Sequence, residues 1–323
     1  MRGGLERGVN GAGRETTATR CLAILSPGDM GHAVGALLAE RGFRLVSALA
    51  GRSELTRSRA ERAGIEDAGD LDGVVSAAEG ILAILPPAEA EPLACRVAEA
   101  MRRTGRTPTY ADCNAVSPAT ALRIAEAITE AGAPFIDAGI IGAAPGPKRP
   151  DTRFYASGPQ AKWLEGLAGS GAQGGIAVIG LGEEIGRASA IKMAYAALTK
   201  GTMTLQAAVL MTAMRLGVFE ELGREFEKSQ PEAWSRMGVL PFLPGDSGRW
   251  IGEMEQIAAT FRDAGVPNDF HRGAAAIFRI MAATPFAAET RETLDRSRSL
   301  EGAIRVFADH LTAAEGEDPP LGS

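Results

Sequence analysis

The sequence predicts an α/β domain with a parallel sheet, joined through a long helix to an all-α C-terminal domain. From residue 22 to about residue 137, short apolar runs alternate with longer amphipathic stretches, as in βαβ units. After about residue 183 the strand-like runs stop and helix-favouring stretches follow. A chain of 323 residues is also longer than one ordinary core requires, which favours two domains.

Seven apolar runs in the N-terminal half are the expected strands. The first five are bounded by Gly or Pro and are separated by segments rich in Ala, Glu and Arg, which favour helices. They cover residues 22–25, 44–49, 80–85, 109–112 and 134–137. Two more, 153–156 and 176–179, follow without long intervening helices, which predicts a less regular edge of the sheet.

The C-terminal part begins with a long helix expected over residues 190–216, where Met, Leu and Val recur with helical spacing. Prolines separate the further helices that we expect at 231–237, 249–264, 269–282 and 287–311. The predicted division is a disordered leader (1–19), a first domain (20–183), a second domain (184–313) and a flexible tail (314–323).

Composition excludes several classes of protein. A net charge of −6 and a pI of about 5.4 argue against holding nucleic acid or an anionic membrane by bulk charge. The three cysteines lie far apart and the three histidines are scattered, so neither a disulfide framework nor a metal site can be recognised. We therefore expect a cytoplasmic protein that acts on a small molecule, without a metal, a membrane or a nucleic acid as partner.

A Gly-rich turn directly follows the first expected strand and precedes an apolar helix. It reads Ser26-Pro27-Gly28-Asp29-Met30-Gly31, which is the pattern G-x-G-x-x-G with Ser at its first position. Small residues are needed here because the turn is tight, the backbone approaches a pyrophosphate and the helix N-terminus faces the phosphates. Such patterns can also be simple turns, but the position between strand and helix favours a dinucleotide-binding Rossmann domain.

The end of the second expected strand bears on the choice of cofactor. NAD enzymes usually have an acidic residue here for the ribose 2′-hydroxyl, whereas this chain has Arg52 and Ser53. A guanidinium and a hydroxyl can hold a 2′-phosphate, so the sequence favours NADP(H) over NAD(H). The alternative is that Arg52 is simply a solvated surface residue.

Further motifs follow in an order that resembles the β-hydroxyacid dehydrogenase superfamily, which includes 6-phosphogluconate and 3-hydroxyisobutyrate dehydrogenases. The resemblance covers residues 21–281 and implies that Leu85, Pro86, Pro87 and Asn114 lie beside the cofactor. Its motifs are Leu82-Ala-Ile-Leu85-Pro86-Pro87, Asp112-Cys-Asn114-Ala-Val-Ser117-Pro118, Phe135-Ile-Asp137-Ala-Gly139-Ile-Ile-Gly142-Ala143 and Gly186-Arg-Ala-Ser-Ala-Ile-Lys192. With the later Arg249-Trp250-Ile-Gly-Glu253-Met254, the chain looks most like a phosphogluconate-dehydrogenase-like branch with its own helical C-terminal domain.

The resemblance also defines a substrate site, from which this chain departs in several places. Asn114 replaces the family's serine, Ile141-Gly142-Ala143 replaces Ser-Gly-Gly, and Ala196 stands where the family has an asparagine. The apparatus that binds a substrate carboxylate is therefore altered. The residues expected to contact the substrate are Asn114, Ser117, Gly142, Ala143, Tyr195 and Trp250.

Lys192 corresponds to the family's catalytic lysine. It is the only charged residue between positions 188 and 198, so its ammonium is either partly desolvated or reaches to water from one helix face. Desolvation would lower its pKa and suit it to acid–base chemistry. Lys200, two helical turns further on, is the second choice.

The sequence as a whole predicts an NADP(H)-dependent oxidoreductase that transfers a hydride between nicotinamide and a small hydroxy or oxo substrate. Two alternatives remain: an imine reductase, which would suit the altered carboxylate motif, and a non-catalytic NADP-binding sensor or scaffold. The apolar content of residues 202–218 exceeds what one helix of a small domain needs to bury, so we expect a homodimer.

Overall fold

The computed structural model describes residues 20–290 and 293–311 of the chain, so the predicted leader and tail lie outside the described residues. Within the described ranges the N-terminal half forms one nine-stranded sheet with the order β3-β2-β1-β4-β5-β6-β7-β9-β8. The strands are β1 Cys21–Leu25, β2 Arg44–Ser47, β3 Ile65–Asp67, β4 Gly80–Ala83, β5 Thr109–Asp112, β6 Phe135–Ile141, β7 Thr152–Ser157, β8 Gly169–Gly171 and β9 Gly174–Gly180.

The direction of the strands confirms the predicted parallel sheet. The first six strands in spatial order, from β3 to β6, pair in parallel. Strand β7 then pairs antiparallel with β6 and parallel with β9, and β8 closes the edge antiparallel to β9. The chain order reverses between β1 and β4, and in open α/β sheets ligands bind beside such a reversal at the carboxyl ends of the strands.

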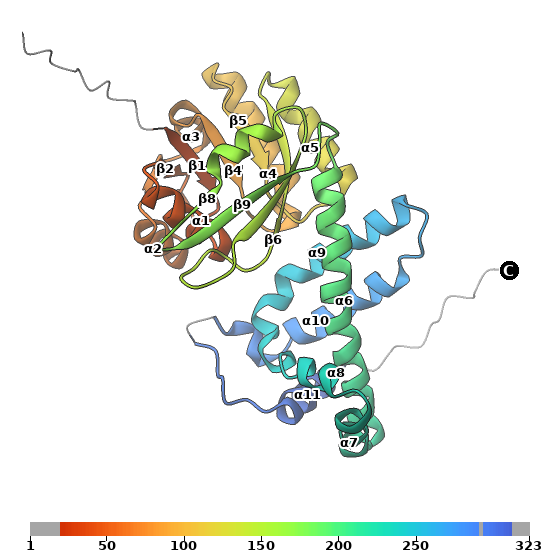
Figure 1. Cartoon of the computed structure of the whole chain (residues 1–323). Coiled ribbons are helices and arrows are strands. Elements are labelled where there is room, and N and C mark those ends of the chain that lie inside the picture. The colour runs from red at the N-terminus through yellow and green to blue at the C-terminus, as the bar shows by residue number, and fades with distance from the viewer. Residues whose placement is uncertain (1–19, 291–292, 312–323) are drawn as a thin grey trace, which may run out of the picture.

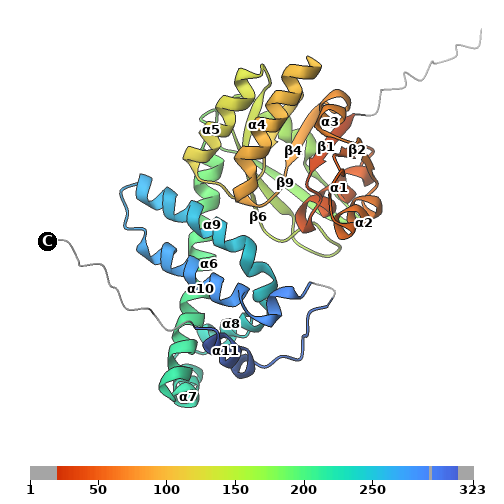
Figure 2. The same cartoon turned by 180° about the vertical axis from the view of Figure 1, so that it is seen from behind.

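Helices cover both faces of this sheet because its strands are apolar on both sides. Alternate residues of β1 point to opposite faces: Ala23 packs in the core under α3, α4 and α5, and Ile24 packs in the core under α1, α2 and η1. Figure 2 shows α4 and α5 in front of the sheet. These helices are α1 Asp29–Glu40, α2 Glu54–Arg62, α3 Leu71–Ala77, α4 Pro87–Thr104, α5 Pro118–Glu130 and the 3-10 helix η1 Ala161–Leu167.

From Arg187 onward the described residues form helices and no strand, as predicted, beginning with the 30-residue helix α6. Figure 1 shows α6 running from the edge of the sheet through the helical domain. A separate apolar core, which includes Met193, Met254, Phe278 and Phe307, holds this domain together. The helices are α6 Arg187–Leu216, α7 Phe219–Ser229, α8 Pro231–Met237, η2 Leu240–Phe242, α9 Pro244–Asp263, α10 Asp269–Ala282, η3 Pro285–Ala288 and α11 Leu300–Asp309.

The expected division between residues 183 and 184 falls between β9 and α6. No helix in the described part of the chain combines the length and the apolar character needed to span a bilayer.

The long helix expected over 287–311 is wrong, because among the described residues of that range only α11 is α-helical. The segment before it is polar, and its side chains bond to nearby groups instead of supporting a helix. Asp295 accepts from both the backbone N–H and the hydroxyl of Ser297, and Ser299 caps α11 by accepting from the backbone of Gly302. The short strands β3 and β8 and the helix α7 were not expected.

Candidate active site

The Gly-rich turn has the geometry that the sequence predicts. Ser26 has a φ of +64°, in the left-handed region that Gly adopts most easily, and its carbonyl accepts from the N–H of Gly28 at 2.7 Å. A Cβ at Gly31 would lie 3.0 Å from that same carbonyl oxygen. The turn therefore tolerates Ser at its first position but needs Gly at its last.

The N-terminus of α1 offers space and N–H groups to an anion. Gly28 is its N-cap residue, and no described side chain caps this end. The first N–H groups of a helix lack partners within the helix, and they carry its partial positive charge. A Cβ at Gly28 would meet only the Ser26 carbonyl oxygen, 3.9 Å away. The turn therefore fits a pyrophosphate approaching the backbone at Gly28, as a bound dinucleotide requires.

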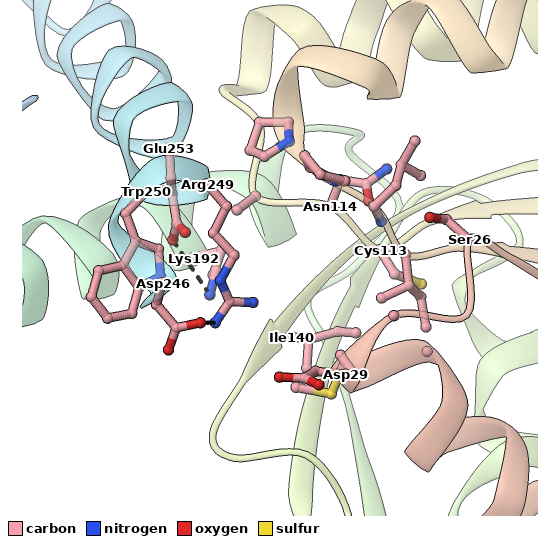
Figure 3. Close-up of a pocket in the computed structure, with 18 of the residues that line it drawn as sticks. Ser26, Asp29, Cys113, Asn114, Ile140, Lys192, Asp246, Arg249, Trp250 and Glu253 are labelled. Carbon is pink, nitrogen blue, oxygen red and sulfur yellow. Dashed lines mark hydrogen bonds and ion pairs between the residues drawn. The ribbon is translucent and has the colours of Figure 1, made fainter. Parts of the chain in front are cut away.

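A cavity of about 510 Å³ lies between the Gly-rich turn and the helical domain. Its walls come from this turn, the segments after β4 and β5, strand β6, and helices α6 and α9. Figure 3 shows Lys192 and Glu253 on the helical side and Ser26 and Asn114 on the sheet side. A ligand in this cavity would touch both domains.

Strand β6 fixes the position of the first turn of α6 and therefore the position of Lys192 along the cavity wall. The Asp137 carboxylate accepts from the backbone N–H groups of Gly186, Ala188 and Ser189 at 2.9–3.1 Å. It also accepts from the hydroxyl of Ser189 at 2.6 Å. Because these donors form the first turn of α6, Asp137 anchors the helix one and a half turns before Lys192.

Gly139 lets α6 come close to the sheet. A Cβ at this position would lie 2.7 Å from the carbonyl oxygen of Ala188 and 2.8 Å from the Cβ of Lys192. Both distances are too short for a residue with a Cβ. The absence of a side chain at Gly139 therefore allows the backbone of Lys192 to lie against β6.

Lys192 lies in the cavity wall beside an acidic partner. Its side chain is 17% exposed, and its Nζ is 3.8 Å from Oε1 of Glu253. Burial lowers the pKa of Lys192, and Glu253 opposes this effect, so the net result is a pKa below the ordinary lysine value. Of the two possibilities that the sequence left open, the structure supports a largely desolvated ammonium.

Lys200 lies in the same cavity and binds the same carboxylate. Its Nζ donates to Oε1 of Glu253 at 2.8 Å and lies 5.4 Å from the ring centre of Trp250. Burial opposes ionisation of Glu253, but the charges of Lys200 and Lys192 outweigh it and hold the pKa of this carboxyl below its ordinary value. The second-choice lysine is thus part of the same cluster.

Asn114 links the ends of two strands. Its Oδ1 accepts from the backbone N–H of Leu85 at 2.7 Å, and its Nδ2 donates to Asp112. Asp112 is completely buried, and burial together with the nearby charge of Asp137 raises its pKa to about 8. Asn114 therefore holds the Leu85-Pro86-Pro87 turn in the cavity wall.

Most of the predicted cofactor residues line the cavity, but three do not. Pro27 is buried behind the turn, and Arg52 and Ser53 are exposed at the end of the β2 segment, outside the cavity lining. Ser53 caps α2 by accepting from the backbone N–H of Thr56. The predicted residues that do line it are Ser26, Gly28, Asp29, Met30, Gly31, Leu85, Pro86, Pro87 and Asn114.

The predicted substrate residues divide equally. Asn114, Gly142 and Trp250 line the cavity together with Lys192. The remaining three lie outside its lining, namely Ser117, Ala143 and Tyr195. Ser117 caps α5 by accepting from the backbone N–H of Thr120, the carbonyl of Ala143 accepts from Thr152, and Tyr195 is 48% exposed.

Four charged residues of the cavity were not among the predicted site residues, although Arg249 and Glu253 belong to a motif noted in the sequence. Asp246, Arg249 and Glu253 share one face of α9, and Arg59 of α2 forms an ion pair with Asp29 at 2.7 Å. The spacing of the three α9 residues, at i, i+3 and i+7, is a signal for a common helix face. The spacing does not identify the element against which this face of α9 packs.

Comparisons with known proteins agree with this architecture. The model for the NAD-binding domain of 6-phosphogluconate dehydrogenase matches residues 22–167, and the model for a domain of unknown function matches residues 213–281. An uncharacterised 28.5 kDa protein of Methanothermus fervidus is 28% identical over 180 residues. That match covers 56% of this chain and 66% of the relative's length.

Solved structures share the fold over most of the chain. A conserved protein described as similar to 3-hydroxyacid dehydrogenases is 25% identical, with a TM-score of 0.55 over 81% of this chain and 98% of that one. A 3-hydroxyisobutyrate dehydrogenase of Mycobacterium tuberculosis gives a TM-score of 0.63 at 17% identity, over 89% and 98%. An imine reductase of Streptomyces aurantiacus gives 0.50 at 18% identity, over 89% and 99%.

The fold and the Gly-rich turn together define a protein with an NAD(P)-binding Rossmann domain joined to a helical domain. Both halves of the chain match the arrangement found in 3-hydroxyacid dehydrogenases. The two family models and the similarity to 3-hydroxyacid dehydrogenases support the β-hydroxyacid dehydrogenase superfamily, in agreement with the resemblance seen in the sequence.

Proposed function

We propose that this protein is an NADP(H)-dependent oxidoreductase that acts on a small hydroxy or oxo substrate. The observation that carries the proposal is the position of Lys192, which is largely buried in the cavity wall opposite the Gly-rich turn. NADP(H), when bound along that turn, supplies or accepts the hydride. Lys192 exchanges the proton that the substrate oxygen gains or loses.

Other residues shape the cavity for this exchange. Asn114 orients the wall at Leu85, and Gly142 and Trp250 border the space that the substrate would occupy. The lowered pKa of Lys192 brings its proton closer to exchange at neutral pH. The preference for NADP(H) rests on Arg52 and Ser53, which stand after β2 where an acidic residue would favour NAD(H).

The test of this function is a substrate panel. NADPH oxidation is followed by absorbance with keto acids, semialdehydes, ketones and cyclic imines. On the best oxo substrate, Lys192→Ala should lower kcat by about 10²–10⁴-fold, because general acid–base help is lost. Lys228→Ala, an exposed lysine of α7, is the matched control and should leave kcat unchanged. Near-normal turnover by Lys192→Ala would refute the proposed role.

The same panel tests imine reduction as a second candidate. The observation that favours it is the cavity border at Gly142, where the chain lacks the family's serine for a substrate carboxylate. Turnover confined to cyclic imines would select this candidate. Binding of NADPH without turnover of any compound would instead favour a sensor or scaffold.

We also propose that the protein is a cytoplasmic homodimer. Helix α6 exposes large apolar side chains, with Leu198 and Leu216 more than 70% exposed and Leu205 53% exposed. Apolar surface of this kind seldom remains open to water. Light scattering at micromolar concentration should give twice the chain mass of 33.6 kDa, and the mass of a single chain would refute the dimer. The cytoplasmic assignment rests on the three dispersed cysteines, which suit a reducing compartment.

A further inference from the structure

Glu253 is a buried carboxylate shared by two lysines. Its side chain on α9 is 9% exposed and faces Lys192 and Lys200, which are 17% and 13% exposed, on α6. Oε1 lies 2.8 Å from Nζ of Lys200 and 3.8 Å from Nζ of Lys192. The Glu253 carboxylate therefore interacts with two ammonium groups, and Lys200 is the nearer of the two.

The charged groups that shift the pKa of Lys192 come from the same two helices, α6 and α9. Arg249 forms an ion pair with Asp246 at 2.9 Å, one turn before Glu253 on α9. Arg249 and Lys200 both disfavour the protonated form of Lys192, and Glu253 favours it. Among these groups, Glu253 stabilises the cationic form of Lys192. Lys200 competes with Lys192 for the Glu253 carboxylate.

We propose that Glu253 is a positioning residue that keeps Lys192 protonated at the cavity wall, and that Lys200 limits this effect by holding the same carboxylate. The inference rests on the proposed function, because it concerns the proton that Lys192 gives to the substrate. Glu253 itself acts through Lys192 and need not touch the substrate.

In the reductive direction, each turnover takes a proton from Lys192. The carbonyl carbon takes a hydride from the reduced nicotinamide, and the carbonyl oxygen takes a proton from Nζ of Lys192. A C–H bond and an O–H bond would form on the substrate. The donor C–H bond of the reduced nicotinamide, the C=O π bond and one N–H bond of Lys192 would break, which would leave oxidised nicotinamide and a neutral amine. A carboxylate 3.8 Å away favours the return of a proton to that amine before the next turnover.

The test observes the lysines directly and needs no substrate. The chain contains five lysines, so the full-length protein labelled with ¹³C-lysine gives a simple spectrum in which each Cε signal reports the charge on its Nζ. The signals of Lys192 and Lys200 are assigned with the variants Lys192→Arg and Lys200→Arg. Lys148, Lys162 and Lys228 are exposed and serve as internal controls of folding and pH.

Two substitutions should move the titration of Lys192 in opposite directions. Glu253→Gln removes the carboxylate charge with little change of shape and should lower the titration midpoint of Lys192 by about one pH unit or more. Lys200→Met removes the competing cation and should raise the midpoint. Should Glu253→Gln perturb folding, a Lys192 midpoint that does not rise in Lys200→Met would still overturn the inference.

A purely structural role for Glu253 would leave the Lys192 midpoint in place in Glu253→Gln, and that result would overturn the inference. A rise in Glu253→Gln or a fall in Lys200→Met would overturn it as well. Because the titration does not depend on turnover, a failed substrate panel with the expected midpoints would overturn the proposed function and leave the role of Glu253 standing.

Discussion

Replacing Asp112 by asparagine should stabilise the protein increasingly as the pH rises. Asp112 is fully buried at the end of β5, and burial and the charge of Asp137 raise its pKa to about 8 from an ordinary value of 3.8. Among the described residues, none donates a hydrogen bond to its Oδ2. Between these two pKa values the folded protein binds one more proton than the unfolded chain, so this carboxyl makes folding less favourable with each step up in pH.

The size of the effect follows from the same two values. Each pH unit between them costs about 1.4 kcal/mol, and about four units separate them, so the total approaches about 6 kcal/mol as an upper limit. Over the two units from about pH 5.5 to 7.5 the loss is about 3 kcal/mol at most. In the Asp112→Asn variant the amide would keep an oxygen for Asn114 and carry no charge, so the variant should escape this loss.

Urea unfolding of both proteins at about pH 5.5, 6.5 and 7.5 measures the effect. The free energy of unfolding of Asp112→Asn relative to wild type should rise steadily across the series. Asp67→Asn is the control, because hydrogen bonds from the backbone of Gly69 and Leu49 lower the pKa of Asp67. That group is ionised in both states throughout the range, so its difference should stay constant. A constant difference for Asp112→Asn would contradict the argument.

Two further substitutions test the cofactor site and the packing of α6. Arg52→Asp should weaken NADPH binding by about 1.5–3 kcal/mol, which is about 10- to 150-fold, and leave NADH binding nearly unchanged. Equal losses for both cofactors in fluorescence titrations would show that Arg52 does not bind the 2′-phosphate. Gly139→Ala forces a Cβ against Ala188 and Lys192 and should cost about 1–3 kcal/mol of unfolding free energy. Gly248→Ala, at a position with open space in α9, is its control and should not destabilise; similar losses in both would refute the close-approach explanation.

The parts of the fold and site that depend on local sequence were predictable. The Gly-rich turn is specified by consecutive residues, and the steric demand at Ser26 appears in the structure as a positive φ. The long helix α6 follows from its helix-favouring composition, and Lys192 stands out because its helical neighbours are uncharged. In each case the signal lies within one element.

The charged partners of Lys192 could not be predicted in this way. Glu253 lies 61 positions further along the chain, in a helix that carries many other charges, and its spacing identifies only a helix face. Which face of α9 meets α6 is decided by how the apolar cores pack, including Met193 and Met254 near the two charged residues. The same reason applies to Arg59, whose partner Asp29 belongs to another helix.

Strand β6 explains why its motif can differ from the family pattern without loss of the site. Asp137 and Gly139 are two positions apart, so they face the same side of the strand, and both act on α6. Asp137 anchors the first turn of the helix and Gly139 lets Lys192 approach. The carboxylate of Asp137 meets the first requirement and the missing side chain of Gly139 meets the second. Neither depends on the residues that follow Gly139. The departures from the family pattern at residues 141–143 therefore leave the anchor of α6 and the close approach of Lys192 in place.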